Sequence, residues 1–456
     1  MRNSLILAFA VLTAGCNLTP PLDPVASPVS ARYPGKTGGT VSADIAWQKF
    51  LTDPRLRKLV EAALANNRDL RIAALNVEQS RAQYGISRSE LFPAIGITAR
   101  GERRRGTGDP GGSGGSILSG NHDVTVDLVS YELDLFGKVR SMNQSALQKY
   151  FATDAARVGA QIALVAEVAN QYLTERALQE QAALSQQTLD GMDLGYGIMK
   201  QRFDAGTVSE LELSSMDVQR QTAKADLAGF RQRIRETENS LVFLAGGSLP
   251  SLPKGRSLYQ VLLADVRAGV SSELLYRRPD IREAEFQLRA ANADIGAARA
   301  QLFPSISLTG SAGTSSTSLS KLFANGTGSW AFAPQIDIPI FSGGRNRYGI
   351  QAVEVSKNIG IANYEKAIQT GFREVADSLA SRSGLDERIA ATESLVAAQR
   401  KRTELATARY ERGLDSYFEV LTATLDFYTA RQSLIQLRLA RNVSSVNLYK
   451  ALGGGW

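Results

Sequence analysis

The pattern of apolar and polar positions along the chain predicts long helices separated by short strands. The stretches between Pro110 and Pro250 and after Pro339 contain no proline, and most of each shows apolar residues at helical spacing. Each stretch predicts one long helix and a shorter partner, at about residues 138–204 with 209–244 and 344–411 with 416–452. At 1.5 Å per residue, each long helix would extend on the order of 100 Å.

The same short motif separates the two helices of each pair. Arg202–Leu213 reads RFDAGTVSELEL, and Arg409–Val420, 207 positions later, reads RYERGLDSYFEV. The glycine of each copy, Gly206 or Gly413, predicts the C-terminal end of one helix. Each copy is therefore predicted to be a tight turn between antiparallel helices, and the chain a tandem duplication of one half.

Each copy of the motif also predicts how the second helix of the pair begins. A serine is followed three positions later by a glutamate, as in a capping box. The predicted boxes pair Ser209 with Glu212 and Ser416 with Glu419.

Short segments with strand-like alternation occur at matching places in the two halves. In each half a Leu-Phe-Pro turn, at Pro93 or Pro304, ends a helical stretch and begins a strand with one apolar face. A loop rich in glycine and serine leads to a second strand, which ends at a corner containing Phe136-Gly137 or Phe341-Ser342-Gly343. The predicted strands cover residues 93–103, 122–135, 304–312 and 329–341. Shorter helices precede them at about 47–91, with a break at Asn66-Asn67, and at about 279–302.

The first residues have the features of a secretory lipoprotein. A basic start and a short apolar run precede Leu12–Cys16, which resembles a bacterial lipobox with Cys16 as the acylated residue. Asn17 in the next position favours the outer membrane in signals of this kind. The predicted divisions are a signal peptide at 1–15, an acylated tether at 16–46, and two structural repeats at 47–250 and 251–456.

Composition excludes several classes of function. The chain has one cysteine and one histidine, His122, so an internal disulfide is impossible and a His/Cys metal site is not expected. The net charge of +7 arises from acidic and basic residues that alternate along helices, which is typical of a solvated surface rather than a nucleic-acid site. Neither Gly35-Lys36-Thr37 nor Gly111–Gly115 has the flanking strand and helix that a phosphate loop or a catalytic serine needs. We expect no enzyme, no cofactor and His122 in a loop or at a rim.

Four strands with one apolar and one polar face indicate a membrane barrel shared between copies of the chain. A sheet can remain in a bilayer only when it closes, and known barrels need about 8 strands or more. Two copies would supply eight strands and three copies twelve. The alanine, glycine, glutamine and serine residues of the long helices fit close packing around a polar lumen better than a solid bundle. A membrane-tethered coiled-coil scaffold would not need these strands.

Six dispersed motifs resemble those of the outer membrane efflux proteins, the TolC-like outer membrane factors. Within that family the chain is most similar to the lipoprotein branch of the OprM and NodT type. The motifs are the lipobox, Glu90–Pro93, Tyr131–Gly137, Arg277–Arg282, Phe341–Arg345 and Phe372–Asp377. The resemblance implies a mixed, mainly α fold: a homotrimer whose 12-stranded transmembrane β-barrel continues as a long periplasmic α-helical barrel.

The resemblance also implies location and partners. Members are anchored in the outer membrane lipid, extend into the periplasm, and pair with a periplasmic adaptor (membrane fusion) protein and an inner-membrane pump, usually of the RND class. The implied function is a passive exit duct for small toxic compounds or antibiotics. The alternative within the same class is the outer-membrane duct of a type I protein secretion system.

Residues near the two turns are implied to control the periplasmic aperture. Matching the family position by position places an acidic ring at Glu419, with Thr422 one turn later and Glu212 as the counterpart in the first half. Tyr410 matches the aromatic residue at the family's tip, and Asp415 stands where TolC-like members have a locking arginine. Crowded carboxylates would favour cations at the mouth. The expected adaptor contacts are the turn residues Gly206, Thr207, Gly413 and Leu414.

Overall fold

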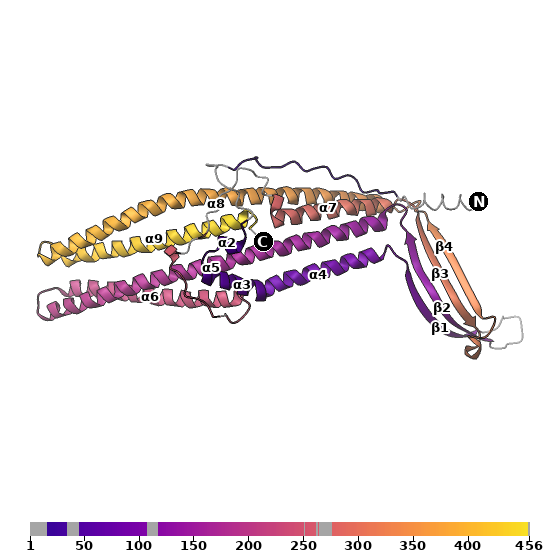
Figure 1. Cartoon of the computed structure of the whole chain (residues 1–456), viewed down its shortest axis with the longest axis horizontal. Coiled ribbons are helices and arrows are strands. Elements are labelled where there is room, and N and C mark those ends of the chain that lie inside the picture. The colour runs from indigo at the N-terminus through magenta and orange to yellow at the C-terminus, as the bar shows by residue number, and fades with distance from the viewer. Residues whose placement is uncertain are drawn as a thin grey trace. The chain divides into compact units, whose positions relative to one another are not determined.

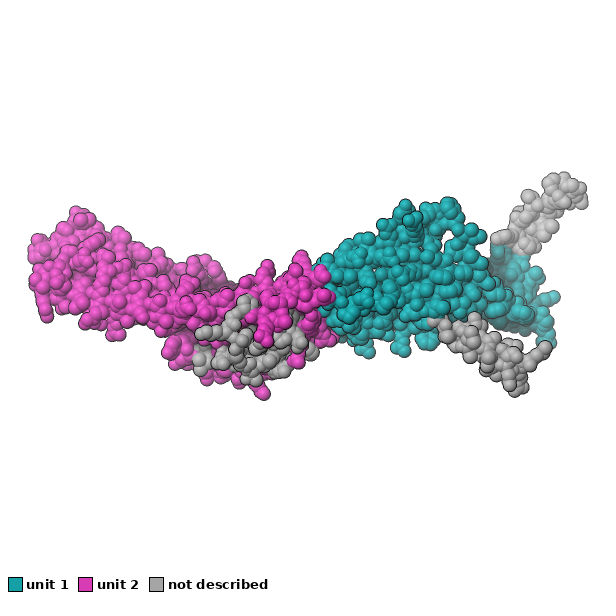
Figure 2. Space-filling model, turned by 90° about the horizontal axis from the view of Figure 1, so that it is seen from above, with its two compact units in different colours: residues 1–25, 77–153, 283–364 teal, residues 26–76, 154–282, 365–456 magenta. Residues whose placement is uncertain are grey.

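The computed structural model describes residues 16–33, 45–106, 117–249, 251–260, 263 and 276–454. The predicted signal peptide, part of the tether, and the motifs at 35–37 and 111–115 lie outside these residues. The chain divides into two compact units (Figure 2): one includes the described residues of 1–25, 77–153 and 283–364, and the other those of 26–76, 154–282 and 365–456.

Two long helical hairpins form much of the chain (Figure 1), as the sequence predicts. The helices of these hairpins are α5 (Lys138–Asp204), α6 (Glu210–Leu244), α8 (Arg345–Glu411) and α9 (Tyr417–Ala451). Shorter helices precede the strands of each half, at α2 (Trp47–Phe50), α3 (Pro54–Asn66), α4 (Arg68–Ser89) and α7 (Pro279–Ala300). Asn67 causes the predicted break between α3 and α4, because its Oδ1 accepts from the Leu70 amide and caps α4.

The strands form one antiparallel sheet in the order β1-β2-β3-β4, so β1 and β4 each have one edge without a partner strand among the described residues. Their bounds are β1 (Ala94–Gly106), β2 (Ile117–Leu133), β3 (Ser305–Ser316) and β4 (Gly328–Asp337). The strand β4 is shorter than predicted and ends before Pro339, whose nitrogen cannot donate a ladder bond. The histidine His122 lies within β2 opposite Gly101, so its expected place in a loop is wrong, whereas a place at a rim stays a prediction.

The register of the sheet separates an apolar face from a polar one. One row across the four strands pairs Ile97 with Val126, Val126 with Ala312, and Ala312 with Trp330. The adjacent row consists of Thr98, Thr125, Gly313 and Ser329 and lies on the opposite face. Ile97 is 77% exposed and Trp330 is 81% exposed, although both are large and apolar. A sheet with such a face needs an apolar surrounding on that side.

Buried polar contacts hold the ends of the helices in the second unit. Asp53 caps α3 and accepts a hydrogen bond from the hydroxyl of Tyr172 on α5 at 3.1 Å. Arg278 is 6% exposed, donates to the last turn of α9 at Ala451 O (2.6 Å), and contacts both Asp280 and Glu374 at 2.7 Å. Its guanidinium satisfies one carbonyl at the C-terminal end of α9, where the last carbonyls lack partners within the helix.

Two C-terminal glycines close the last helix. Gly453 and Gly454 are buried, and their amides donate to Lys450 O and Tyr449 O at 2.9 and 3.0 Å. Both glycines have positive φ angles, 94° and 51°, so they close α9 with a turn that favours glycine.

Candidate functional site at the hairpin tips

The first tip connects α5 to α6 through a turn with a glycine in the left-handed region. Gly206 has φ 70°, its amide donates to Phe203 O at 2.8 Å, and the Thr207 amide donates to Arg202 O at 2.9 Å. This pair of bonds is the Schellman motif. The Thr207 hydroxyl also donates to Arg202 O at 2.9 Å, so its polar group is used within the turn.

The predicted capping box is present at the first tip. The Ser209 amide donates to Glu212 Oε2 at 2.9 Å, and the Glu212 amide donates to Ser209 Oγ at 3.3 Å. The carboxylate of Glu212 therefore lies against the positive end of α6, where it stabilises the helix start.

The second tip repeats the turn but not the cap. Gly413 has φ 70°, its amide donates to Tyr410 O at 2.9 Å, and the Leu414 amide donates to Arg409 O at 3.0 Å. At the start of α9 the side chain of Ser416 makes no capping hydrogen bond, so the predicted box with Glu419 is wrong. The turn is closed by the Glu419 amide, which donates to the backbone oxygen of Ser416 at 3.3 Å.

A bidentate ion pair spans the second tip. Arg409 donates through Nε to Asp415 Oδ2 at 2.5 Å and through Nη2 to Oδ1 at 3.1 Å. The hydrogen bond from Arg409 holds the pKa of the Asp415 carboxyl below its usual value. The sequence pattern predicts no partner for Asp415.

Glu419, like Asp204, Glu210 and Glu411, is an acidic residue at the tips whose side chain remains available. It is exposed, and among the described residues its carboxylate accepts no hydrogen bond and forms no ion pair. Thr422, three positions later, donates its hydroxyl back to Phe418 O at 2.9 Å. Residues three apart share a helix face, so Glu419 and Thr422 lie on the same face of α9.

Tyr410 connects the two hairpins of one chain. Arg202 Nη1 donates to the Tyr410 hydroxyl at 2.5 Å, and its guanidinium carbon lies 5.6 Å from the centre of the Tyr410 ring. The Tyr410 ring packs edge-on against Tyr417 at 5.1 Å between centroids. Burial and the neighbouring Tyr410 raise the pKa of Tyr417. The repeat includes Arg202, but the sequence predicts neither its bond to Tyr410 nor the position of Tyr417 beside that ring.

Further contacts join the hairpins away from the tip. The hydroxyls of Ser185 on α5 and Tyr428 on α9 are 2.6 Å apart, and Tyr428 also donates to Asp226 on α6 at 3.3 Å. An apolar cluster of Leu189, Met192, Ala223 and Leu227 includes Leu425 of α9 at its edge. The hairpins therefore pack together through α9.

The predicted adaptor-contact residues are all at the surface. Gly206 and Gly413 have no atom within 4 Å of where a Cβ would lie, and Thr207 is exposed. Leu414 is 61% exposed although it is apolar, which is the property expected of a residue that a partner covers.

Two other features are absent from the described part of the chain. There, no group of three or more histidine, cysteine, aspartate or glutamate residues has the geometry to bind a metal ion. Among the same residues, none of the helices combines the length and the hydropathy needed to cross a bilayer.

Comparison with known proteins identifies the family. The model of the outer membrane efflux protein family matches residues 59–247 and 270–454. The toluene efflux pump outer membrane protein TtgC of Pseudomonas putida is 42% identical over 455 residues, 98% of this chain and 94% of its own length.

Solved structures agree with this assignment. A membrane protein from Pseudomonas aeruginosa superposes with a TM-score of 0.90 at 39% identity, covering 97% of this chain and 98% of that one. The open state of the Neisseria gonorrhoeae MtrE outer membrane channel gives 0.89 at 37% identity, covering 96% and 98%. The chain therefore belongs to the outer membrane efflux protein family, whose members are the outer-membrane channels of efflux systems.

Proposed function

We propose that three copies of this chain form a passive exit duct for small toxic compounds, with a 12-stranded barrel in the outer membrane and a helical tube in the periplasm. The observation that carries this proposal is the four-stranded sheet with two open edges and opposite apolar and polar faces. Edges left open in a bilayer are costly, and pairing β4 of one copy with β1 of the next removes them. The family resemblance favours three copies over two.

A periplasmic adaptor and an inner-membrane pump, of the RND class by resemblance, complete the proposed system. The pump supplies the energy, so we infer that the chain itself catalyses no reaction and needs no cofactor. The adaptor would contact the tips at Gly206, Thr207, Gly413 and Leu414. Small molecules are favoured over secreted proteins as cargo, because the named relative TtgC is a toluene efflux protein.

The proposal includes the N-terminal divisions and the aperture. Residues 1–15 would be removed as a signal peptide, residues 16–46 would form a tether acylated at Cys16, and residues 47–250 and 251–456 would be the repeats. The Cys16 thiol is exposed, as an attachment site requires. Three Glu419 carboxylates, one from each copy, would line the aperture together with Thr422.

Deletion in the native host tests the proposal. Cells would be complemented with the wild-type chain or Cys16→Ser, and minimum inhibitory concentrations would be measured for dyes, detergents, solvents and antibiotics. We expect the deletion to sensitise cells and the wild-type chain to restore tolerance. Unchanged tolerance together with loss of a secreted protein from the medium would replace efflux with secretion.

A further inference from the structure

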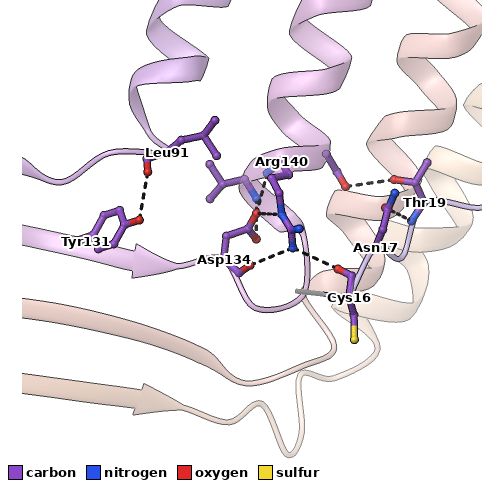
Figure 3. Close-up of polar contacts among 9 residues, drawn as sticks. Cys16, Asn17, Thr19, Leu91, Tyr131, Asp134 and Arg140 are labelled. Atoms are coloured by element: carbon purple, nitrogen blue, oxygen red, sulfur yellow. Dashed lines mark hydrogen bonds and ion pairs between the residues drawn. The ribbon is translucent and has the colours of Figure 1, made fainter. Parts of the chain in front are cut away.

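The backbone of Cys16 is bound at the corner between β2 and α5, residues 134–140, which we name the β2–α5 corner (Figure 3). The Cys16 amide donates to Leu135 O at 3.0 Å, and Arg140 Nη2 donates to Cys16 O at 3.5 Å. The sulfur atom points away from Arg140 and is exposed. We propose that the β2–α5 corner is a docking site for the lipid-bearing residue and fixes its acyl chains beside the edge where the strands leave the membrane. This inference rests on the lipid modification proposed above.

Gly137 makes the close approach of Cys16 possible. It has φ 75°, and a Cβ at this position would lie 2.8 Å from Cys16 O, closer than real Cβ atoms approach another heavy atom. The β2–α5 corner also orients Arg140, the side chain that donates to Cys16 O. Asp134 accepts from the Val139 and Arg140 amides at 3.2 and 2.9 Å and from Arg140 Nε at 3.0 Å. The guanidinium of Arg140 is thereby directed toward Cys16 O.

Small and polar residues extend the contact along the next four residues of the tether. Thr19 Oγ1 and Ser141 Oγ are 3.2 Å apart, and Asn292 Nδ2 donates to Pro20 O at 2.9 Å. Ser141 and Asn292 are both buried. At Gly296, one turn after Asn292 on α7, a Cβ would lie 2.2 Å from Thr19 Oγ1 and 3.0 Å from the Thr19 nitrogen. Residues 16–20 therefore lie in a track built by α5 and α7.

The second half of the chain has the same corner without a docked segment. Gly344, directly before α8, has φ 87° and corresponds to Gly137, but a Cβ there would meet only the Tyr348 side chain, at 3.1 Å. The neighbouring Gly343 has φ 60°, and no atom lies within 4 Å of its Cβ position. The positive φ is therefore a requirement of the turn in both halves. The contact with Cys16 is an additional property of the first half.

The chemistry of the docked atoms fits an acylated cysteine. The Cys16 nitrogen contributes one N–H as a peptide amide, and an N-acylated cysteine is also an amide that retains this donor. A chain attached to the sulfur would leave on the side away from the corner, because the thiol is exposed. The chain changes from strand to helix between Leu133 and Lys138. Docking therefore places the acyl chains beside the ends of the strands that would form the barrel.

A disulfide tests docking directly in the full-length protein. The two hydroxyl oxygens of Thr19 and Ser141 are 3.2 Å apart, so Thr19→Cys with Ser141→Cys brings two thiols within bonding range. We expect this double variant to be oxidised in most heat-modifiable trimers isolated from the outer membrane, as measured by protection from a maleimide reagent. Reduced thiols in folded trimers would overturn the proposal.

Gly137→Ala and Gly343→Ala provide a matched pair in the double-cysteine background. Both impose a side chain on a positive φ, but only Gly137→Ala meets Cys16. We expect the oxidised fraction to fall about fivefold or more for Gly137→Ala and Gly296→Ala, because hydrogen bonds and contact are lost together, and to remain unchanged for Gly343→Ala. Equal loss for Gly137→Ala and Gly343→Ala would assign the effect to the turn and contradict docking.

Labelling with radioactive palmitate separates this inference from the lipid modification. Label on the wild-type chain but not on Cys16→Ser confirms the modification, whatever the result with the cysteine pair. If the wild-type chain is unlabelled but the double variant still forms its disulfide between positions 19 and 141, lipid attachment is contradicted. The docking site would then be a contact for an unmodified N-terminus only.

Discussion

The two hairpin tips have the same repeat and the same backbone turn, but their arginines bind different partners. Arg409 is held within its own tip by Asp415, whereas its counterpart Arg202 binds Tyr410 of the other hairpin. The residue that corresponds to Asp415 in the first tip is Val208, which offers no charge. The partner on the other hairpin differs too, because Phe203, the counterpart of Tyr410, has no hydroxyl for Arg409 to bind.

The carboxylates of the two tips differ in the same way. Glu212 and Ser209 form a capping box at the start of α6. Ser416 and Glu419 form no such box, and the carboxylate of Glu419 has no partner among the described residues. At the first tip the carboxylate of Glu212 is held against the start of its own helix. The second tip presents an exposed acid and the exposed apolar Leu414, and we therefore expect it to carry more of the function.

The largest expected effect comes from Leu414→Glu. If a partner covers this side chain, its loss removes about 1.5–3 kcal/mol of apolar contact, or roughly 10- to 100-fold in affinity. The minimum inhibitory concentrations should fall toward those of the deletion strain at unchanged trimer levels. Thr207→Glu should have a smaller effect, and Leu319→Glu, at an exposed leucine of the β3–β4 connection, should have none. Tolerance equal to wild type for Leu414→Glu would remove this residue from the adaptor surface.

Val208→Asp should convert the first tip into a copy of the second. The new carboxylate would compete for Arg202 and break its bond to Tyr410, which costs about 1 kcal/mol and shifts a two-state equilibrium about fivefold. We expect higher single-channel conductance and greater sensitivity to large antibiotics. Val208→Thr, which adds no charge, is the control, and equal conductance for both variants would show that the Arg202–Tyr410 bond does not restrain the tips.

Replacing the serine at the start of α6 or α9 with alanine should destabilise the two tips to different extents. Ser209→Ala removes a capping hydrogen bond and should destabilise the first tip by about 1 kcal/mol, whereas Ser416→Ala should change the second by a few tenths at most. Hydrogen exchange of the amides at residues 207–213 and 414–420 measures both effects. Comparable acceleration at the two tips would contradict the difference in capping.

The smallest effect should come from pH at the second tip. The pKa of Asp415 in the folded chain is below the usual 3.8, so the ion pair with Arg409 stabilises the tip fully above pH 3.8. This stabilisation is lost as the pH falls through the lowered pKa of Asp415. Hydrogen exchange at residues 409–416, corrected for its intrinsic pH dependence, should therefore accelerate below about pH 4. Asp415→Asn should abolish this additional acceleration, and a variant that retained it would assign the pH dependence to another group.

The sequence predicted the elements well where the signal was local. Proline spacing and helical periodicity located α5 and α8, and Gly206 and Gly413 located both turns, because a left-handed residue is needed to end these helices. The alternation of Ile95 and Ile97 likewise identified β1. These features depend on neighbours in the chain, which the sequence contains.

The sequence did not predict interactions that depend on competition between possible partners or on residues far apart in the chain. Ser416 and Glu419 match the capping pattern as well as Ser209 and Glu212 do, but the pattern contains no information on the Arg409–Asp415 pair that closes the second tip. The Arg202–Tyr410 bond joins residues 208 positions apart. The docking of Cys16 on Leu135 likewise requires the folded chain.

Selectivity for cations tests the central claim that Glu419 lines the aperture. Reversal potentials would be measured in planar bilayers under a salt gradient for the wild type, Glu419→Gln and Glu212→Gln. We expect cation preference to fall for Glu419→Gln and to persist for Glu212→Gln, because glutamine can still cap α6 and the charge of Glu212 is held against the helix. Unchanged selectivity in Glu419→Gln, or an equal loss in Glu212→Gln, would contradict the difference between the tips.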